Sequence, residues 1–377
     1  MNLLIGADIV PTESNIDLFM AGDVDALVGE DLKKILSESA YRIFNLEVPL
    51  VDTENPIPKC GPNLSSATDA VNAFTAMGVD LLTLANNHIA DQGAQGLSST
   101  CSTLSKNNIA YVGVGDNLQV AAKPHLFNFA DKKMGIYACC EHEFGIATEL
   151  SAGANPFDPL ESLDHVSKLK EQCDYVIVLY HGGKEHYPYP SHNLQKTCRK
   201  LIEKGADLVV CQHTHCIGCE EKYNGGTIVY GQGNFLFDRR INECWDTSLL
   251  ITLNENMEIS YLPLQKKDNG VRLASSDAAR QIMKDFYARS ADIQQVGFIE
   301  KKYQEFADSM IDGYLFVMAG TKKTFVYRAL NKLSGYRLTK WLLQKKYTKQ
   351  QKLCLLNFIE CEAHREVIIA GLKKTDQ

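Results

Sequence analysis

Five short segments of the chain place polar side chains directly after an apolar run. Their polar residues are Asp8, Glu47, Asn87, His88, His181, His213 and His215. Two carboxylates, an amide and several imidazoles form a mixed donor set that suits Zn, Mn or Fe. A bridging carboxylate from Glu47 would hold two cations close together, and such a pair can activate a water for in-line displacement at phosphorus. The residue types therefore predict a metal centre with hydrolytic chemistry.

Each of these residues also has an ordinary structural interpretation. Asp8 could be a turn or cap residue, Glu47 an exposed loop acid, Asn87 part of a helix N-cap, and His181 the start of a flexible turn before two glycines. The spacing of His213 and His215 supports a ligand role, because residues i and i+2 of an extended segment point the same way and both imidazoles can reach one metal cluster. It is the occurrence of all five segments at successive strand ends that favours a metal site.

The elements that must position these residues are short apolar strands separated by helical stretches. Strands are predicted over 3–5, 42–46, 79–85, 110–114, 134–139, 175–180, 207–211 and 227–230, with helices over 66–77 and 97–106 and a closing hairpin over 248–264. This alternation indicates a layered α/β fold. Ligands of open α/β sheets collect beyond the carboxyl ends of the strands, where the candidate residues stand.

Length and composition exclude several classes of protein. The 377 residues are 45% apolar and 23% charged with a net charge of −7, which rules out a disordered, collagen-like or coiled-coil chain. No stretch reaches the roughly 18 apolar residues of a membrane helix, and Asp8 interrupts the first apolar run before it could form a signal segment. We therefore expect a cytoplasmic protein without a membrane span. The 12 cysteines then read as reduced, mostly buried thiols.

The charge is unevenly distributed along the chain. Residues 1–264 contain 18 Lys/Arg and 34 Asp/Glu, whereas residues 265–377 contain 21 and 12. Apolar residues recur at helical spacing after residue 270, and Thr348 with Gln351 forms a candidate capping box. We expect an α/β domain over 1–268 and a mainly helical region over 269–377. The basic region is either a surface for a polyanion or membrane headgroups, or a set of solvated helix faces that dock on the acidic body.

Several motifs together resemble the CapA-type branch of the metallophosphoesterase (calcineurin-like) superfamily, the capsule or poly-γ-glutamate synthesis proteins. The similarity runs in order over roughly residues 2–240. It is carried by 45–50 (NLEVPL), 85–93 (ANNHIADQG), 181–187 (HGGKEHY), 213–215 (HTH) and 230–238 (YGQGNFLFD). The resemblance implies a metallophosphoesterase-like sandwich of two packed sheets flanked by helices, with the C-terminal helices as an appendage.

The resemblance also implies roles for single residues. Asp8 and His215 would bind one metal, Glu47 would bridge, and Asn87, His181 and His213 would bind the second metal. His88 would contact the phosphoryl oxygen or protonate the leaving group, which suits an imidazole. The sequence departs from the superfamily pattern because Val10 stands where an imidazole is usual, Glu47 where Asp is usual, and Gln212 where Gly is usual. One or two ions per chain are therefore expected.

Residues near the crevice could complete the site. Glu185 and His186 follow His181 closely and could contact substrate, and Asn234 either shapes the pocket or holds a turn. A thiolate zinc or redox pair at Cys216 and Cys219 is disfavoured because no second CxxC exists.

The expected function is a metal-dependent hydrolase of the phosphoester type that acts on a phosphorylated metabolite or glycan. The alternative is a non-hydrolytic accessory or binding component of capsule or polyglutamate (exopolymer) assembly. The partner in either case is a small phosphorylated or polymeric anionic substrate, and no nucleic acid is expected.

Overall fold

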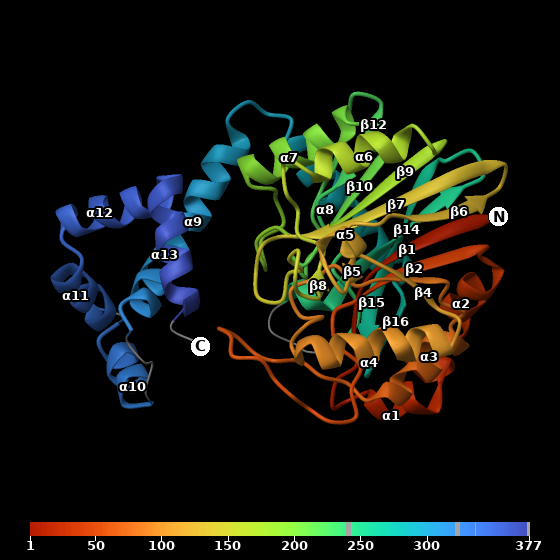
Figure 1. Ribbon diagram of the computed structural model, residues 1–377, viewed down its shortest axis with the longest axis horizontal. Coiled ribbons are helices and arrows are strands. Elements are labelled where there is room, and N and C mark those ends of the chain that lie inside the picture. The colour runs from red at the N-terminus through yellow and green to blue at the C-terminus, as the bar shows by residue number, and fades with distance from the viewer. Residues whose placement is uncertain (239–242, 321–324, 336, 375–377) are drawn as a thin grey trace. The chain divides into compact units, whose positions relative to one another are not determined.

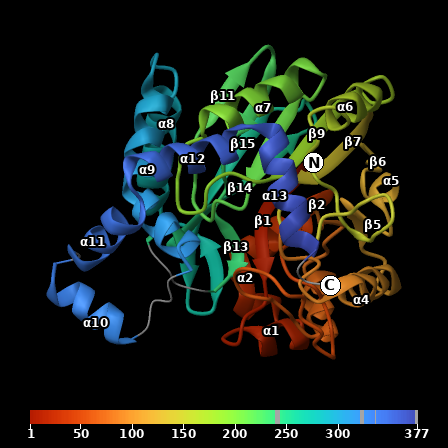
Figure 2. The same cartoon turned by 60° about the vertical axis from the view of Figure 1, so that its left-hand side comes forward.

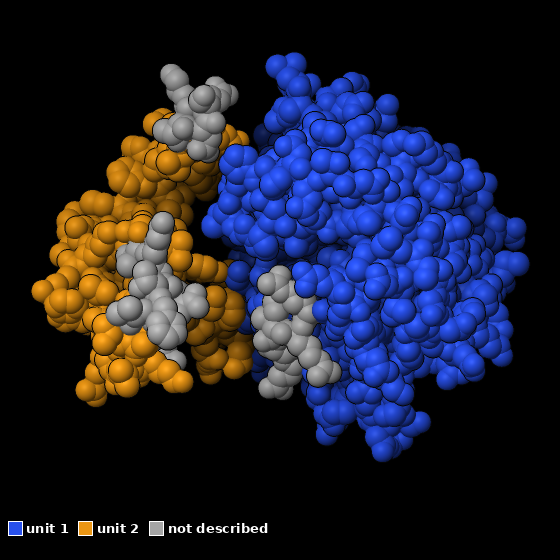
Figure 3. Space-filling model, turned by 90° about the horizontal axis from the view of Figure 1, so that it is seen from below, with its two compact units in different colours: residues 1–299 blue, residues 300–377 orange. Residues whose placement is uncertain are grey.

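The computed structural model describes residues 1–238, 243–320, 325–335 and 337–374. It divides into two compact units, residues 1–299 and 300–377, which Figure 3 colours separately. The first unit contains the strands and the second contains helices.

The first sheet of unit 1 has eight strands. Four parallel strands form one half: β1 (Asn2–Val10), β2 (Tyr41–Leu46), β3 (Leu81–Thr83) and β4 (Ala110–Val112). Three antiparallel strands continue it beyond β1: β14 (Thr247–Asn254), β15 (Ile259–Lys267) and β16 (Gly270–Leu273). A further strand, β13 (Asn234–Phe237), pairs in parallel with the last residues of β1.

The second sheet has six strands in the order β11-β12-β10-β9-β7-β6. Its central strands are parallel: β7 (Lys132–Cys140), β9 (Tyr175–His181), β10 (Leu208–Gln212) and β12 (Gly226–Val229). The antiparallel edge strands are β6 (His125–Phe129) and β11 (Glu220–Tyr223). A separate two-residue pairing joins β5 (Val114–Gly115) to β8 (Gly153–Ala154).

The two sheets pack face to face through alternating strand residues. Leu3 and Ile5 of β1 share a buried cluster with Ile177 and Leu179 of β9, whereas Leu4 belongs to the cluster on the opposite face of the first sheet. This division follows from the twofold period of a strand. Helices cover the outer faces (Figures 1 and 2): α1 (Ile16–Ala21), α2 (Val24–Glu38), α3 (Val71–Ala76) and α4 (Gly93–Lys106) on the first sheet, and α6 (Ser162–Lys170) and α7 (His192–Glu203) on the second. The expected α/β sandwich of two packed sheets flanked by helices is confirmed.

Two short helical turns and one short helix lie in the connections. They are η1 (Thr68–Ala70), η2 (Glu243–Asp246) and α5 (Leu118–Ala121). The helix expected over 66–77 therefore forms as η1 followed by α3.

The chain after residue 269 does not become helical at once. It first forms β16, where Val271 is fully buried and Arg272 donates hydrogen bonds to the carbonyl groups of Ala26 and Leu27 in α2. The helix α8 (Ser276–Asp292) then packs Phe286 against Leu249 and Ile217. Unit 1 thus continues to residue 299, past the boundary expected between 268 and 269.

Unit 2 is built from helices. The helix α9 (Phe298–Met318) begins at the end of unit 1, and α10 (Phe325–Leu333), α11 (Arg337–Lys346), α12 (Lys349–Glu360) and α13 (Glu362–Lys374) follow. A small core of Leu315, Phe316 and Leu343 holds unit 2 together. The capping box of Thr348 and Gln351 forms as expected at the start of α12. Within the described residues, the helices include none with the length and apolar character to span a bilayer.

Candidate metal centre

Within each sheet, the strand register places candidate residues side by side near the carboxyl ends of the parallel strands. Asp8 of β1 lies beside Asn45 of β2 and Asn234 of β13. In the second sheet, His181 at the end of β9 lies beside Gln212 at the end of β10. Because parallel strands end at the same edge, the loops that carry the remaining candidates emerge there as well.

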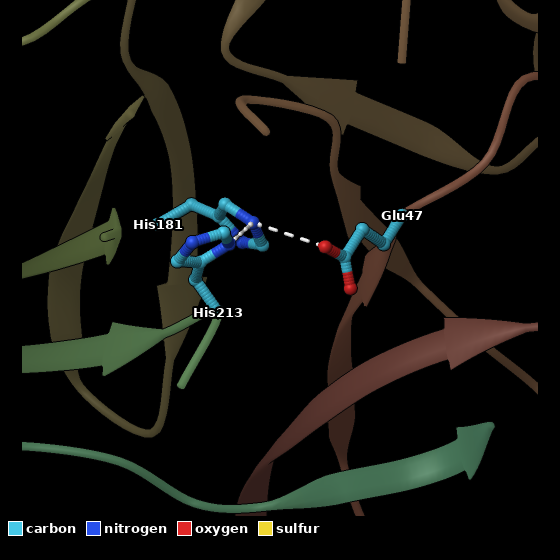
Figure 4. Close-up of side chains that lie close together, drawn as sticks. All are labelled: Glu47, His181 and His213. Atoms are coloured by element: carbon cyan, nitrogen blue, oxygen red, sulfur yellow. Dashed lines mark hydrogen bonds and ion pairs between the residues drawn. The ribbon is translucent and has the colours of Figure 1, made fainter. Parts of the chain in front are cut away.

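The first group of potential ligands consists of Glu47, His181 and His213 (Figure 4). Their donor atoms lie within 4.8 Å of one another, and all three side chains are buried. The Nε2 atom of His181 is 3.2 Å from Glu47 Oε1 and 3.1 Å from His213 Nδ1. The Oδ1 atom of Asn87 lies 3.1 Å from the same His181 nitrogen. Four side chains from four separate segments thus surround one small volume.

The second group consists of Asp8, Glu47 and His215, and their donor atoms also lie within 4.8 Å of one another. The Nδ1 atom of His215 is 3.6 Å from Asp8 Oδ2 and 2.8 Å from Asn234 Oδ1. Glu47 belongs to both groups, as a bridging carboxylate would.

Two buried oxygen atoms in these groups have no hydrogen-bond partner among the described residues. They are Oδ2 of Asp8 and Oε2 of Glu47. A buried carboxylate oxygen without a partner costs free energy. Divalent cations with mixed oxygen and nitrogen ligands would satisfy both atoms, so the donor set fits such ions.

Burial and close packing shift the pKa values of the ligand groups in different directions, and Glu47 raises the pKa of His181. Burial, together with the neighbouring Glu47 carboxylate, raises the pKa of Asp8 from 3.8 to about 6. Burial also raises the pKa of Glu47, but the adjacent His181 outweighs it and the net direction is downward. Burial holds the pKa of His213 well below its usual value. A neutral imidazole is the form that binds a metal.

The histidines near the centre adopt an uncommon backbone conformation. His186, His213 and His215 have φ values of 60°, 84° and 54°, in the left-handed region that few non-glycine residues occupy. The extended geometry expected for His213 and His215 is therefore wrong. Strand β10 ends at Gln212, and the two imidazoles enter different ligand groups because the chain turns between them.

His88 directly follows Asn87, the amide that contacts His181, and the ring of His88 is held by Asp91. The Nδ1 atom of His88 is 2.6 Å from Asp91 Oδ2, which also accepts a hydrogen bond from the backbone N–H of Leu64. The buried ammonium of Lys59 pairs with the other oxygen of Asp91.

The structure places the three candidate substrate residues at the edge of the ligand groups. Glu185 Oε1 lies 4.0 Å from His213 Nε2, and Glu185 Oε2 lies 3.9 Å from His186 Nε2. Burial lowers the pKa of His186. Asn234 contacts His215, so its amide orients that imidazole.

Sequence reasoning missed several residues that support the centre. Asn45 donates a hydrogen bond to Asp8, and the ring of Trp245 packs on His215 with 4.6 Å between ring centroids. Asp91 stands three residues after His88 and donates its backbone N–H to the His88 carbonyl, so a four-residue turn brings the two side chains together. Lys59 and Trp245 carry no comparable signal, because each is far in sequence from the residues it contacts.

Fold and donor set together define a layered α/β protein with a candidate two-cation centre where its strands end. A model of the family described as bacterial capsule synthesis protein PGA_cap matches residues 4–239, and the chain belongs to this family. All of the candidate ligands fall within the matched residues. The resemblance to capsule or poly-γ-glutamate synthesis proteins that the motifs carry is thereby confirmed.

Two similar proteins are capsule or PGA biosynthesis proteins, in agreement with the family match. The chain is 27% identical over 267 residues to the capsule biosynthesis protein CapA of Bacillus anthracis, an alignment that covers 66% of this chain and 65% of the relative. It is 30% identical over 192 residues to the PGA biosynthesis protein CapA of Bacillus subtilis, covering 50% of each chain. The chain thus spans between half and two thirds of the length of these relatives. A crystal structure of a novel phosphatase from Mycoplasma pneumoniae aligns at 13% identity with a TM-score of 0.44, over 71% of this chain and 94% of that one.

Proposed function

We propose that the protein is a divalent-metal-dependent hydrolase of phosphoesters, acting on a phosphorylated metabolite or glycan. The observation that carries the proposal is the pair of buried ligand groups joined at Glu47. The unpartnered oxygens of Asp8 and Glu47 support it, because a protein that bound no cation there would bury them at a cost.

The residues divide into two ligand sets that share Glu47. Asp8 and His215 would hold one ion, and Asn87, His181 and His213 the other. Such ions, of which Mn, Zn and Fe suit the donors, would polarise a phosphoryl group and lower the pKa of a water molecule. Asn45 and Asn234 keep Asp8 and His215 in position through hydrogen bonds.

His88 is the candidate proton donor to the leaving group. Its Nδ1 faces the Asp91 carboxylate, which fixes the ring and leaves Nε2 available to hold a proton. Glu185 and His186 lie beside His213 and would contact the part of the substrate outside the ligand groups.

A purified sample allows a direct test. Bound metal is measured by elemental analysis, and turnover of aryl phosphate mono- and diesters is measured with added Mn²⁺. The variants His213→Ala and His88→Ala are compared with His165→Ala, which alters a histidine on α6 in contact with Tyr137. Hydrolysis should be lost in the first two and retained in the third. Loss of metal should accompany His213→Ala but not His88→Ala, because only His213 belongs to a ligand group.

The names of the relatives favour a second candidate function, a non-hydrolytic accessory or binding component of capsule or polyglutamate assembly. In that case the centre would hold a cation that binds a carboxylate of the polymer or stabilises the fold. Stoichiometric metal without turnover of any phosphoester in a broad panel would support this function over hydrolysis.

A further inference from the structure

Unit 2 contains a long segment from which acidic residues are absent. The 47 residues from 313 to 359 include ten Lys/Arg and no Asp or Glu. Residues 1–299 have the opposite balance, with 24 Lys/Arg and 38 Asp/Glu. The charged side chains of this segment are therefore all positive.

The same segment exposes large apolar side chains. Six of them, on α10, α11 and α12, are between 48% and 83% exposed: Leu330, Leu333, Trp341, Leu353, Leu356 and Ile359. We call these six, together with the exposed Lys332, Lys340, Lys345, Lys349 and Lys352, the α10–α12 surface. Isolated exposed apolar residues are common, but a concentration of them among cations indicates an interaction site.

Helix α12 shows how the two kinds of side chain combine. It has no buried residue, and Leu353 and Leu356 are both about half exposed. Residues three and four apart lie on one side of a helix, so Lys349 and Lys352 flank these leucines. The helix therefore offers a narrow apolar strip bordered by ammonium groups.

Helices α10 and α11 repeat the combination. In α10 the polar Asn331 is buried and accepts a hydrogen bond from the backbone N–H of Thr339, whereas Leu330 and Leu333 are exposed. In α11 the exposed Trp341 has the ammonium of Lys345 4.2 Å from its ring centroid. A tryptophan beside lysines suits the boundary between water and lipid, where one side of the ring is apolar and the other is wet.

We infer that the α10–α12 surface binds the anionic headgroup region of a lipid bilayer, with its apolar side chains inserted among the acyl chains. Charge complementarity selects this partner, because the lysines match anionic headgroups and the leucines and tryptophan need an apolar phase. A second copy of the chain would bring two surfaces of the same charge together. A soluble polyanion would match the lysines and leave the apolar side chains in water.

The test measures flotation of the full chain with vesicles of phosphatidylcholine alone and of phosphatidylcholine mixed with phosphatidylglycerol. Binding should require the anionic lipid and should weaken as salt is raised. The variant Lys349→Glu/Lys352→Glu should bind about thirtyfold more weakly or worse, since each lysine near an anionic surface contributes about a fivefold factor. Acidic residues in the first turn of α12 suit the helix dipole, so this variant should fold.

Matched controls separate the lipid surface from general effects of charge and hydrophobicity. Lys33→Glu/Lys34→Glu makes the same charge change on the exposed face of α2 and should leave binding unchanged. Leu353→Ser/Leu356→Ser should weaken binding, and Leu150→Ser/Leu160→Ser, at positions 96% and 80% exposed in unit 1, should not.

Four results would overturn the inference. Equal binding to both kinds of vesicle, or unchanged binding by the α12 charge variant, would show that the lysines do not recognise lipid. If soluble poly-glutamate displaced the chain from vesicles and Leu353→Ser/Leu356→Ser left vesicle binding unchanged, the surface would be assigned to a polyanion. Association of the chain with itself, abolished by the serine substitutions and without vesicle binding, would assign it to a second copy.

Discussion

Replacing Asp8 by asparagine should make the metal-free protein more stable at neutral pH, although Asp8 is a proposed ligand. Burial and the adjacent Glu47 raise the pKa of Asp8 from 3.8 to about 6. A group with this direction of shift binds its proton more tightly in the folded state. Its contribution to stability is therefore present below the unfolded pKa and is lost as the pH rises through the folded pKa.

The structure gives the size of this effect. A rise in pKa from 3.8 to about 6 corresponds to about 3 kcal/mol. Asp8 has no exposed surface, so solvent screening does not reduce the figure. The free energy of unfolding of the wild type should fall by about 2 kcal/mol relative to Asp8→Asn between about pH 4 and pH 7. The rest of the effect lies below pH 4, where the unfolded Asp8 is still protonated, and the amide of the variant does not ionise.

Urea unfolding in the presence of a chelator, followed by circular dichroism at both pH values, measures this difference. Asp25→Asn is the control, because Asp25 is exposed on α2 and paired with Lys33. Saturating Mn²⁺ should reverse the order of stability, since an ion that binds only the folded state stabilises the chain with the better site. A difference between wild type and Asp8→Asn that is the same at both pH values would refute the reasoning.

Two further predictions concern the ions and the extent of unit 1. Glu47→Gln should lose both ions in elemental analysis and Asp8→Asn only one, because Glu47 alone belongs to both groups; equal metal contents would contradict the bridging role. A chain ending at residue 299 should fold and bind metal, whereas one ending at 268 should not yield folded protein. The shorter chain loses the buried side chains of Val271, Phe286, Ile293 and Ile299. Their burial is worth about 6–12 kcal/mol, which approaches the whole stability of a domain. Circular dichroism with thermal unfolding distinguishes the two chains. Cooperative unfolding of the 268-residue chain would place the end of the core earlier.

The positions of the candidate ligands were predictable because they depend on strand ends. Asp8 and His181 lie in the last part of apolar strands, and Glu47 follows one directly. A correct assignment of strands therefore places each of them at the carboxyl end of a strand, Asp8 and Glu47 on the first sheet and His181 on the second. The layered fold follows from the same alternation of strands and helices. Glu47 reaches the histidines of both ligand groups because the two sheets pack against each other. The spacing of residues along the chain does not reveal this packing.

Other features were out of reach of a single sequence. The left-handed backbone of His213 and His215 is unfavourable for these residues taken alone. The turn follows β10 directly, and the carbonyl of Cys216 just after it accepts a hydrogen bond from the backbone N–H of Gly233. Lys59 reaches Asp91 from a loop without regular structure. Strand β16 is four residues long, and its place in the sheet depends on pairing with β15, which propensity does not reveal.

The two proposals rest on different parts of the chain and can fail separately. Every candidate ligand lies between Asp8 and His215, within the residues that match the capsule synthesis family, whereas the α10–α12 surface begins at Leu330 and lies outside that match. Leu353→Ser/Leu356→Ser should therefore change vesicle binding without changing metal content, and Glu47→Gln should do the reverse. A variant of either kind that altered both properties would show that the helices and the metal centre are energetically coupled, because neither substitution touches the other set of residues.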